Sequence, residues 1–89
     1  MNNADLFSEL VATYQKHGWE FQRAVKVADF DALWFSRPSH GNREAWELRL
    51  ISQTQYALFE AFEPDETEEQ REEMRREMEA RMKDYVLKQ

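Results

Sequence analysis

The sequence Trp46-Glu47-Leu48-Arg49-Leu50 alternates large apolar residues with charged ones. This alternation is typical of a β-strand that buries one face and exposes the other. The segment before it, residues 38–44, contains Pro, Ser, Gly and Asn and predicts a loop. The other stretches that favour strands are residues 19–27, 32–37 and 56–62. The centre of the chain is therefore predicted to be an antiparallel sheet of three or four strands.

Both ends of the chain change from strand-like to helical spacing. Residues 4–17 place their apolar side chains in one stripe with a period of roughly 3.6 residues. Gly18 follows where helices often end in a left-handed residue. After Pro64, a capping box of Thr67 and Gln70 predicts a second helix that runs to about Val86.

These elements predict an α+β fold in the order α-β-β-β-β-α, with the sheet flanked by an N-terminal and a C-terminal helix. Both helices are expected on one face of the sheet. The chain has 89 residues. Because this length suits one hydrophobic core, residues 1–89 are predicted to form a single small domain.

The composition argues against several kinds of chemistry. The chain has no Cys, so disulfides, thiolate metal sites and Cys nucleophiles are excluded. Its two histidines, His17 and His40, lack the spacing of a metal site. His40 lies beside Ser39 in a short loop, where a third group that orients the histidine is rarely available. We therefore expect a protein that is not an enzyme, with no catalytic residue, metal or cofactor.

The sequence also indicates where the protein works. No apolar run approaches the ~20 residues that cross a bilayer. Residues 1–10 carry Asp5 and Glu9 and no basic residue, unlike a signal peptide. We expect a cytoplasmic protein with no membrane contact.

The charge of the chain argues against direct nucleic acid binding. The formal net charge is −6, and residues 63–89 hold six basic and ten acidic residues. Phosphate backbones are bound by clustered Lys and Arg, which this chain lacks. The order of elements resembles the double-stranded RNA-binding domain in coarse topology. That family has a Lys-rich cluster at the start of its last helix, where this chain has carboxylates. They are Asp65, Glu66, Glu68 and Glu69.

We expect the protein to be a protein–protein interaction module that self-associates as a homodimer or binds another protein. If Leu33, Phe35 and Trp46 face the helices, apolar side chains remain on the other side of the sheet. Such patches often mark interfaces. The predicted interface residues are Trp34, Ile51, Phe59 and Phe62.

The alternative is an acidic inhibitor or antitoxin-like protein that occupies the basic nucleic-acid-binding groove of a partner. Its acidic surface would consist of Glu66, Glu68, Glu69, Glu72 and Glu73. These carboxylates would also suit the positive end of a helix dipole and keep the protein soluble. The sequence leaves open which role they have, and it does not decide the strand order or the oligomeric state.

Overall fold

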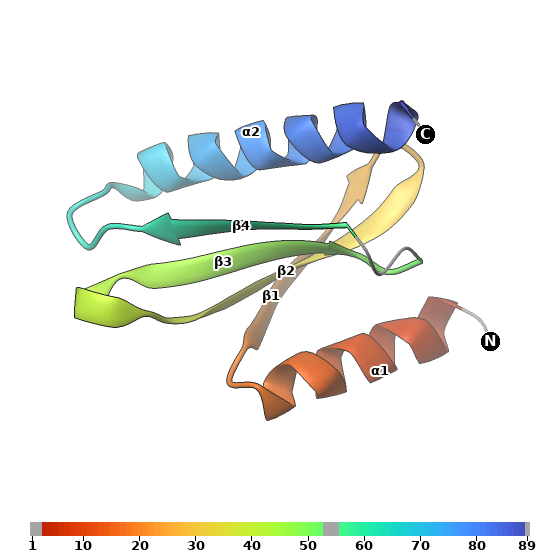
Figure 1. Ribbon diagram of the computed structural model, residues 1–89, viewed down its shortest axis with the longest axis horizontal. Helices are drawn as coiled ribbons and strands as arrows, with labels where there is room; N and C mark the ends of the chain where they lie inside the picture. Colours follow the sequence, from red (N-terminus) through yellow and green to blue (C-terminus); the bar gives the residue numbers. More distant parts are fainter. Residues whose placement is uncertain (1–2, 53–55, 89) are drawn as a thin grey trace.

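The computed structural model describes residues 3–52 and 56–88, and its elements follow the predicted order (Figure 1). The α-helices are α1 (Asn3–Lys16) and α2 (Glu68–Leu87), and a short 3₁₀ helix, η1, spans His40–Asn42. The strands are β1 (Glu20–Val27), β2 (Phe30–Pro38), β3 (Glu44–Leu50) and β4 (Ala57–Phe62). The α+β prediction is therefore confirmed. The predicted connection at 52–55 lies mostly outside the described residues.

The local signals at the helix ends are confirmed as well. The Thr67 side chain accepts a hydrogen bond from the backbone of Gln70, whose own side chain accepts one from the backbone of Thr67. This reciprocal pair satisfies backbone donors that a helix start leaves free. After α1, Gly18 adopts a φ of 86°, which glycine tolerates because it has no Cβ.

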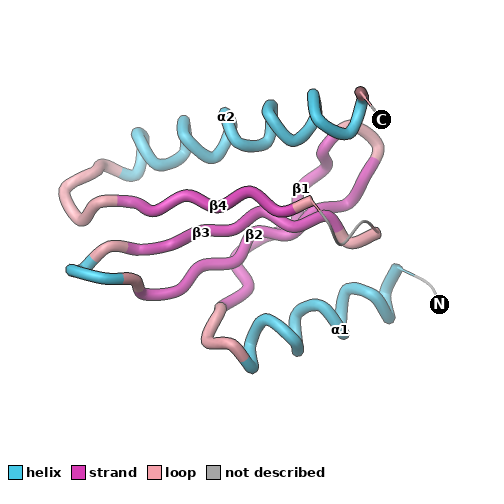
Figure 2. Tube along the Cα trace, in the orientation of Figure 1, coloured by secondary structure: helices cyan, strands magenta, loops and turns pink. Residues whose placement is uncertain are grey.

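The four strands form one antiparallel sheet in the order β1-β2-β3-β4, as the strand path in Figure 2 shows. Trp34 of β2 lies opposite Leu48 of β3, which lies opposite Leu58 of β4. These three side chains share a face, because opposed residues of antiparallel strands project to the same side. An irregularity between Phe21 and Arg23 shifts the register of β1 and places Arg23 opposite Trp34.

The two helices cover opposite faces of the sheet (Figure 1). Helix α1 packs on the face that carries Leu33 and Phe35. Helix α2 packs on the face that carries Trp34 and Leu48. The expectation that both helices share one face is therefore wrong. The reason lies in β2, whose residues 32–36 are all buried and need cover on both sides.

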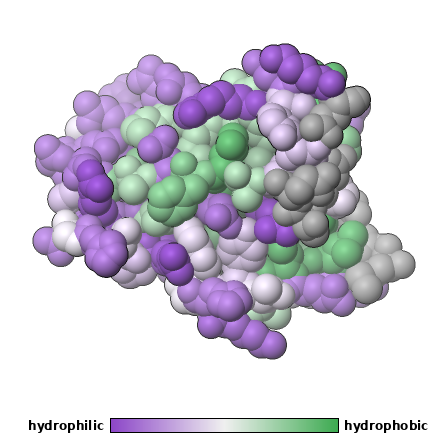
Figure 3. All heavy atoms as spheres, in the orientation of Figure 1, coloured by the Kyte–Doolittle hydropathy of each residue, from purple (hydrophilic) through white to green (hydrophobic). Residues whose placement is uncertain are grey.

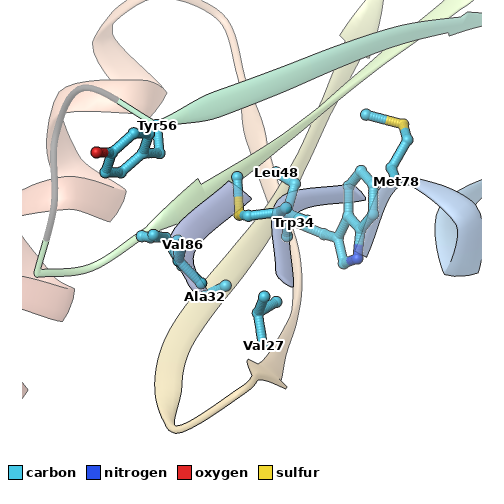
Figure 4. Packing of buried hydrophobic residues seen from close by; sticks show 9 residues of the cluster. Val27, Ala32, Trp34, Leu48, Tyr56, Met78 and Val86 are labelled. Atoms are coloured by element: carbon cyan, nitrogen blue, oxygen red, sulfur yellow. The ribbon is translucent and has the colours of Figure 1, made fainter. Parts of the chain in front are cut away.

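The larger core lies between the sheet and α2, where Trp34, Leu48, Met78 and Val86 belong to one buried cluster (Figure 4). The Trp34 indole N–H donates to Glu79 Oε2 of α2 at 2.8 Å, so its polar atom is satisfied inside the core. Met78 and Val86 bring the C-terminal part of α2 onto this cluster.

Arginine side chains, rather than apolar ones, hold the N-terminal half of α2 to the sheet. Arg75 is 3% exposed, and its guanidinium lies 4.3 Å from the ring centroid of Trp46. Glu68 and Glu72 accept hydrogen bonds from Arg75. Arg23 of β1 donates to Glu72 at 2.8 Å. This network replaces the apolar stripe that the first turns of the helix lack.

The network predicts a specific sensitivity to acid. Hydrogen bonds from Arg23 and Arg75 hold the pKa of Glu72 below its ordinary 4.5. A carboxyl with a lowered folded-state pKa stabilises the fold above its unfolded pKa and loses that contribution as the pH falls through the folded value. We therefore expect Glu72→Gln to lower the free energy of unfolding at pH 7 and to flatten its decline below about pH 4.5.

Urea unfolding across that pH range measures this effect. Glu69→Gln, an exposed carboxylate of the same helix turn, is the matched control and should follow the parent chain. Equal pH dependence of Glu72→Gln and the parent would show that the network contributes nothing.

Candidate functional site

The two edge strands differ in how they are protected against pairing with another strand. β1 has an irregular register, and it carries Glu20, Arg23 and Lys26. Bulges and edge charges of this kind discourage pairing with another chain. β4 has a regular register against β3, and Glu60 is its one charged residue. Among the described residues β4 pairs with β3 alone, so its outer backbone groups are directed away from the sheet.

The α1 side of β4 is open next to this edge. Helix α1 covers the part of the face that carries Leu33 and Phe35. Beyond it, β4 places Ala57, Phe59 and Ala61 on the α1 side, because they oppose the α1-side residues of β3. We call these three side chains and the outer backbone of β4 the β4 surface.

Phe59 is the largest apolar group on the β4 surface, and it is 56% exposed. Figure 1 views the molecule from the β4 side, with β1 at the back. In the same orientation, Figure 3 shows apolar side chains gathered over the strands and bordered above by the hydrophilic side of α2. An apolar patch with a polar rim is typical of a surface that another protein covers.

A hydrogen-bonded cluster separates the β4 surface from α1. The Tyr14 hydroxyl of α1 donates to Glu47 Oε2 of β3, and Arg49 Nη1 donates to the same hydroxyl at 3.3 Å. Burial, followed by the hydrogen bond to Glu47 and its negative charge, raises the pKa of Tyr14 to about 12. Because Glu47 lies opposite Phe59 and Arg49 opposite Ala57, fixed polar groups border the apolar surface on this side.

The α2 side of β4 has a small pocket of about 170 Å³. Its lining residues include Tyr56, Leu58, Met82 and Tyr85. Small-molecule sites usually occupy roughly 300–1,000 Å³, so this pocket is too small for most ligands. In the part of the chain that the structure describes, no group of three or more His, Cys, Asp or Glu side chains could hold a metal ion.

The structure separates the four residues that the sequence predicted as an interface. Trp34 and Phe62 are 0% exposed, and Ile51 is buried in the cluster beneath α1. The expectation that Trp34 and Ile51 point away from both helices is wrong, because each face of the sheet has its own helix. Phe59 is the member of the set that a partner can reach without opening the core.

The structure also divides the predicted acidic surface. Three of its carboxylates, Glu66, Glu68 and Glu72, accept hydrogen bonds within the chain. The other two, Glu69 and Glu73, are exposed, and Glu68 is exposed as well despite its bond to Arg75. Part of the negative charge of this surface is therefore compensated by the chain's own arginines.

Sequence reasoning missed Ala57 and Ala61 as parts of the surface, as well as the bordering Tyr14 and Arg49. A signal was present for the alanines. The spacing Ala57-x-Phe59-x-Ala61 puts one large and two small apolar residues on one face, which is little apolar area for a core. The contact of Tyr14 with β3 depends on the placement of α1 and left no local signal.

Comparison with known protein families, curated proteins and solved structures found no match to this chain. Within residues 3–52 and 56–88, neither helix has an apolar stretch long enough to span a membrane. The function is therefore inferred from the β4 surface itself.

The cluster bordering this surface gives a test of its geometry at high pH. Because its folded-state pKa lies above the ordinary 10.0, neutral Tyr14 stabilises the fold fully below pH 10 and loses this contribution as the pH rises toward 12. We expect the tyrosinate absorbance of the parent chain, minus that of Tyr14→Phe, to show a midpoint near pH 12.

Glu47→Gln should move the midpoint down toward pH 10, because it removes the negative charge that opposes ionisation. A midpoint already near 10 in the folded parent chain would show that Tyr14 is neither buried nor bonded to Glu47 in solution.

Proposed function

We propose that this chain is a non-enzymatic protein–protein interaction module that self-associates through the β4 surface. The proposal rests mainly on one observation, which is that the regular edge strand β4 carries an exposed Phe59 and one charge, whereas the other edge is irregular and charged. Proteins that stay monomeric usually protect both edges of a sheet.

Strand pairing at β4 would supply two contributions to binding. The outer backbone groups of β4 would gain hydrogen bonds, each worth about 0.5–1.5 kcal/mol net. Burial of a Phe side chain contributes up to about 1.5–3 kcal/mol, and a symmetric dimer buries two copies of Phe59. Loss of rotational and translational freedom opposes these terms by several kcal/mol. Because the favourable terms exceed this cost only modestly, we expect a weak dimer that dissociates on dilution.

A second copy of the chain is a suitable partner for this edge. An antiparallel strand pair has a two-fold axis, so β4 can pair with itself and present the same groups from both sides. Two-fold dimers are also the commonest closed assemblies of soluble proteins. The acidic-inhibitor alternative has less support, because three of its five carboxylates bond within the chain.

We expect Phe59→Asp to abolish self-association. The substitution places a charge in the centre of the proposed contact and removes its largest apolar group. Light scattering over a concentration series should show the parent chain rising toward the dimer mass, and Phe59→Asp remaining a monomer.

Leu87→Asp is the matched control, because Leu87 is also exposed but lies at the end of α2. It should dimerise like the parent chain, and circular dichroism should show that both variants are folded. A parent chain that stays monomeric at high micromolar concentration would refute the proposal.

The salt dependence distinguishes the two candidate functions. Self-association through backbone and apolar groups should persist in roughly 1 M salt, where the Debye length is about 3 Å. It should also persist when Glu69 and Glu73 are both changed to Lys. Association that weakens steeply with salt, or that this double variant abolishes, would favour the acidic surface as the contact.

A further inference from the structure

The face that each β4 side chain occupies limits how two copies can pair. Ala57, Phe59 and Ala61 project to the α1 side, and Leu58 and Glu60 project to the α2 side. If the sheet continues across the contact, side chains of the same face must oppose each other. The two-fold axis then lies between the two copies of one residue. Shifting the pairing by one residue would put side chains of opposite faces against each other, so that register is not allowed.

Three registers bring the central part of β4 onto the axis. Glu60 on the axis would place two carboxylates directly opposite each other, which is destabilising. Leu58 on the axis would pair β4 residues 57–59 alone, because the paired segment would run past the start of the strand. Phe59 on the axis pairs residues 57–61 and keeps the two carboxylates apart.

We propose that a second copy of this chain pairs antiparallel with β4 so that the two Phe59 side chains meet on the two-fold axis. This inference rests on the proposed function and adds the register of the contact. Ala57 of each copy then lies opposite Ala61 of the other, and these small residues leave room for the aromatic pair. Two sheets join into one, and the charged edge β1 remains at both outer ends.

The α2 side of the contact is compatible with this register. Leu58 of one copy lies opposite Glu60 of the other. Leu58 lines the small pocket beside Met82 and Tyr85. Glu60 Oε2 lies 3.9 Å from Arg81 within its own chain, so its charge already has a partner when its aliphatic part meets Leu58.

The register can be tested by disulfide trapping, because the chain has no Cys of its own. Ala57→Cys and Ala61→Cys retain Phe59 and are expected to fold and dimerise. A disulfide needs Cα atoms about 4.4–6.8 Å apart, and directly opposed antiparallel residues lie roughly 4.5–5.5 Å apart. Mild oxidation of an equal mixture should give the mixed disulfide at least about tenfold above either homodisulfide.

The homodisulfides should be rare because two cysteines that both replace Ala57 would lie four positions apart across the contact, roughly 13 Å at the rise of a strand. The same separation applies to two copies of the Ala61→Cys variant. Ala24→Cys, on the opposite edge strand β1, controls for random collision. When it is mixed with either β4 variant, it should form no mixed disulfide. Light scattering of the reduced variants shows whether a dimer is present before oxidation.

The outcomes separate this inference from the proposed function. A dimer in which Ala57→Cys mainly forms its homodisulfide would move the axis toward the start of β4. A dimer in which Ala61→Cys mainly does so would move the axis toward the end of the strand. Either result overturns the register and leaves self-association intact. A dimer in which none of these disulfides forms would overturn the contact at β4, and a strict monomer would overturn both proposals.

Discussion

The burial of β2 on both faces is the constraint on which the rest of this structure depends. Residues 32–36 are all buried, and the apolar side chains among them, at positions 32–35, alternate between a cluster under α1 and a cluster under α2. A strand of this kind is stable only when each face of the sheet has its own cover. The two helices therefore lie on opposite faces, and the sheet becomes the middle layer of three (Figure 1).

This arrangement explains why an apolar surface remains at β4. Helix α1 packs on the face of β2 through Phe35, and Tyr14 reaches as far as Glu47 of β3. The α1 side of β4 has no such cover, and Phe59 is exposed there. The proposed self-association would pair the outer edge of β4 and place a second Phe59 beside the first on this uncovered side of the sheet.

The other face is closed by different means. Helix α2 runs across it, and the first turns of the helix bring arginines to the sheet where apolar side chains are usual. Nitrogen atoms of Arg23, Arg71 and Arg75 are buried without a hydrogen-bond partner among the described residues. Buried ionic networks often cost as much in desolvation as they return in attraction. Removing one partner of such a network is costly, even where the intact network adds little net stability, because it leaves the other charge buried and unpaired.

The sequence by itself determined the elements, because alternation, helical spacing, Gly18 and the Thr67 cap are local features read within a few residues. It also identified Phe59 as an interface candidate. The tertiary structure alone decided that the helices lie on opposite faces, that Trp34 and Ile51 are buried in separate clusters, and that β4 is an edge. An apolar residue has the same local pattern whether a helix of its own chain or another protein covers it. The difference arises only when segments far apart in sequence pack together.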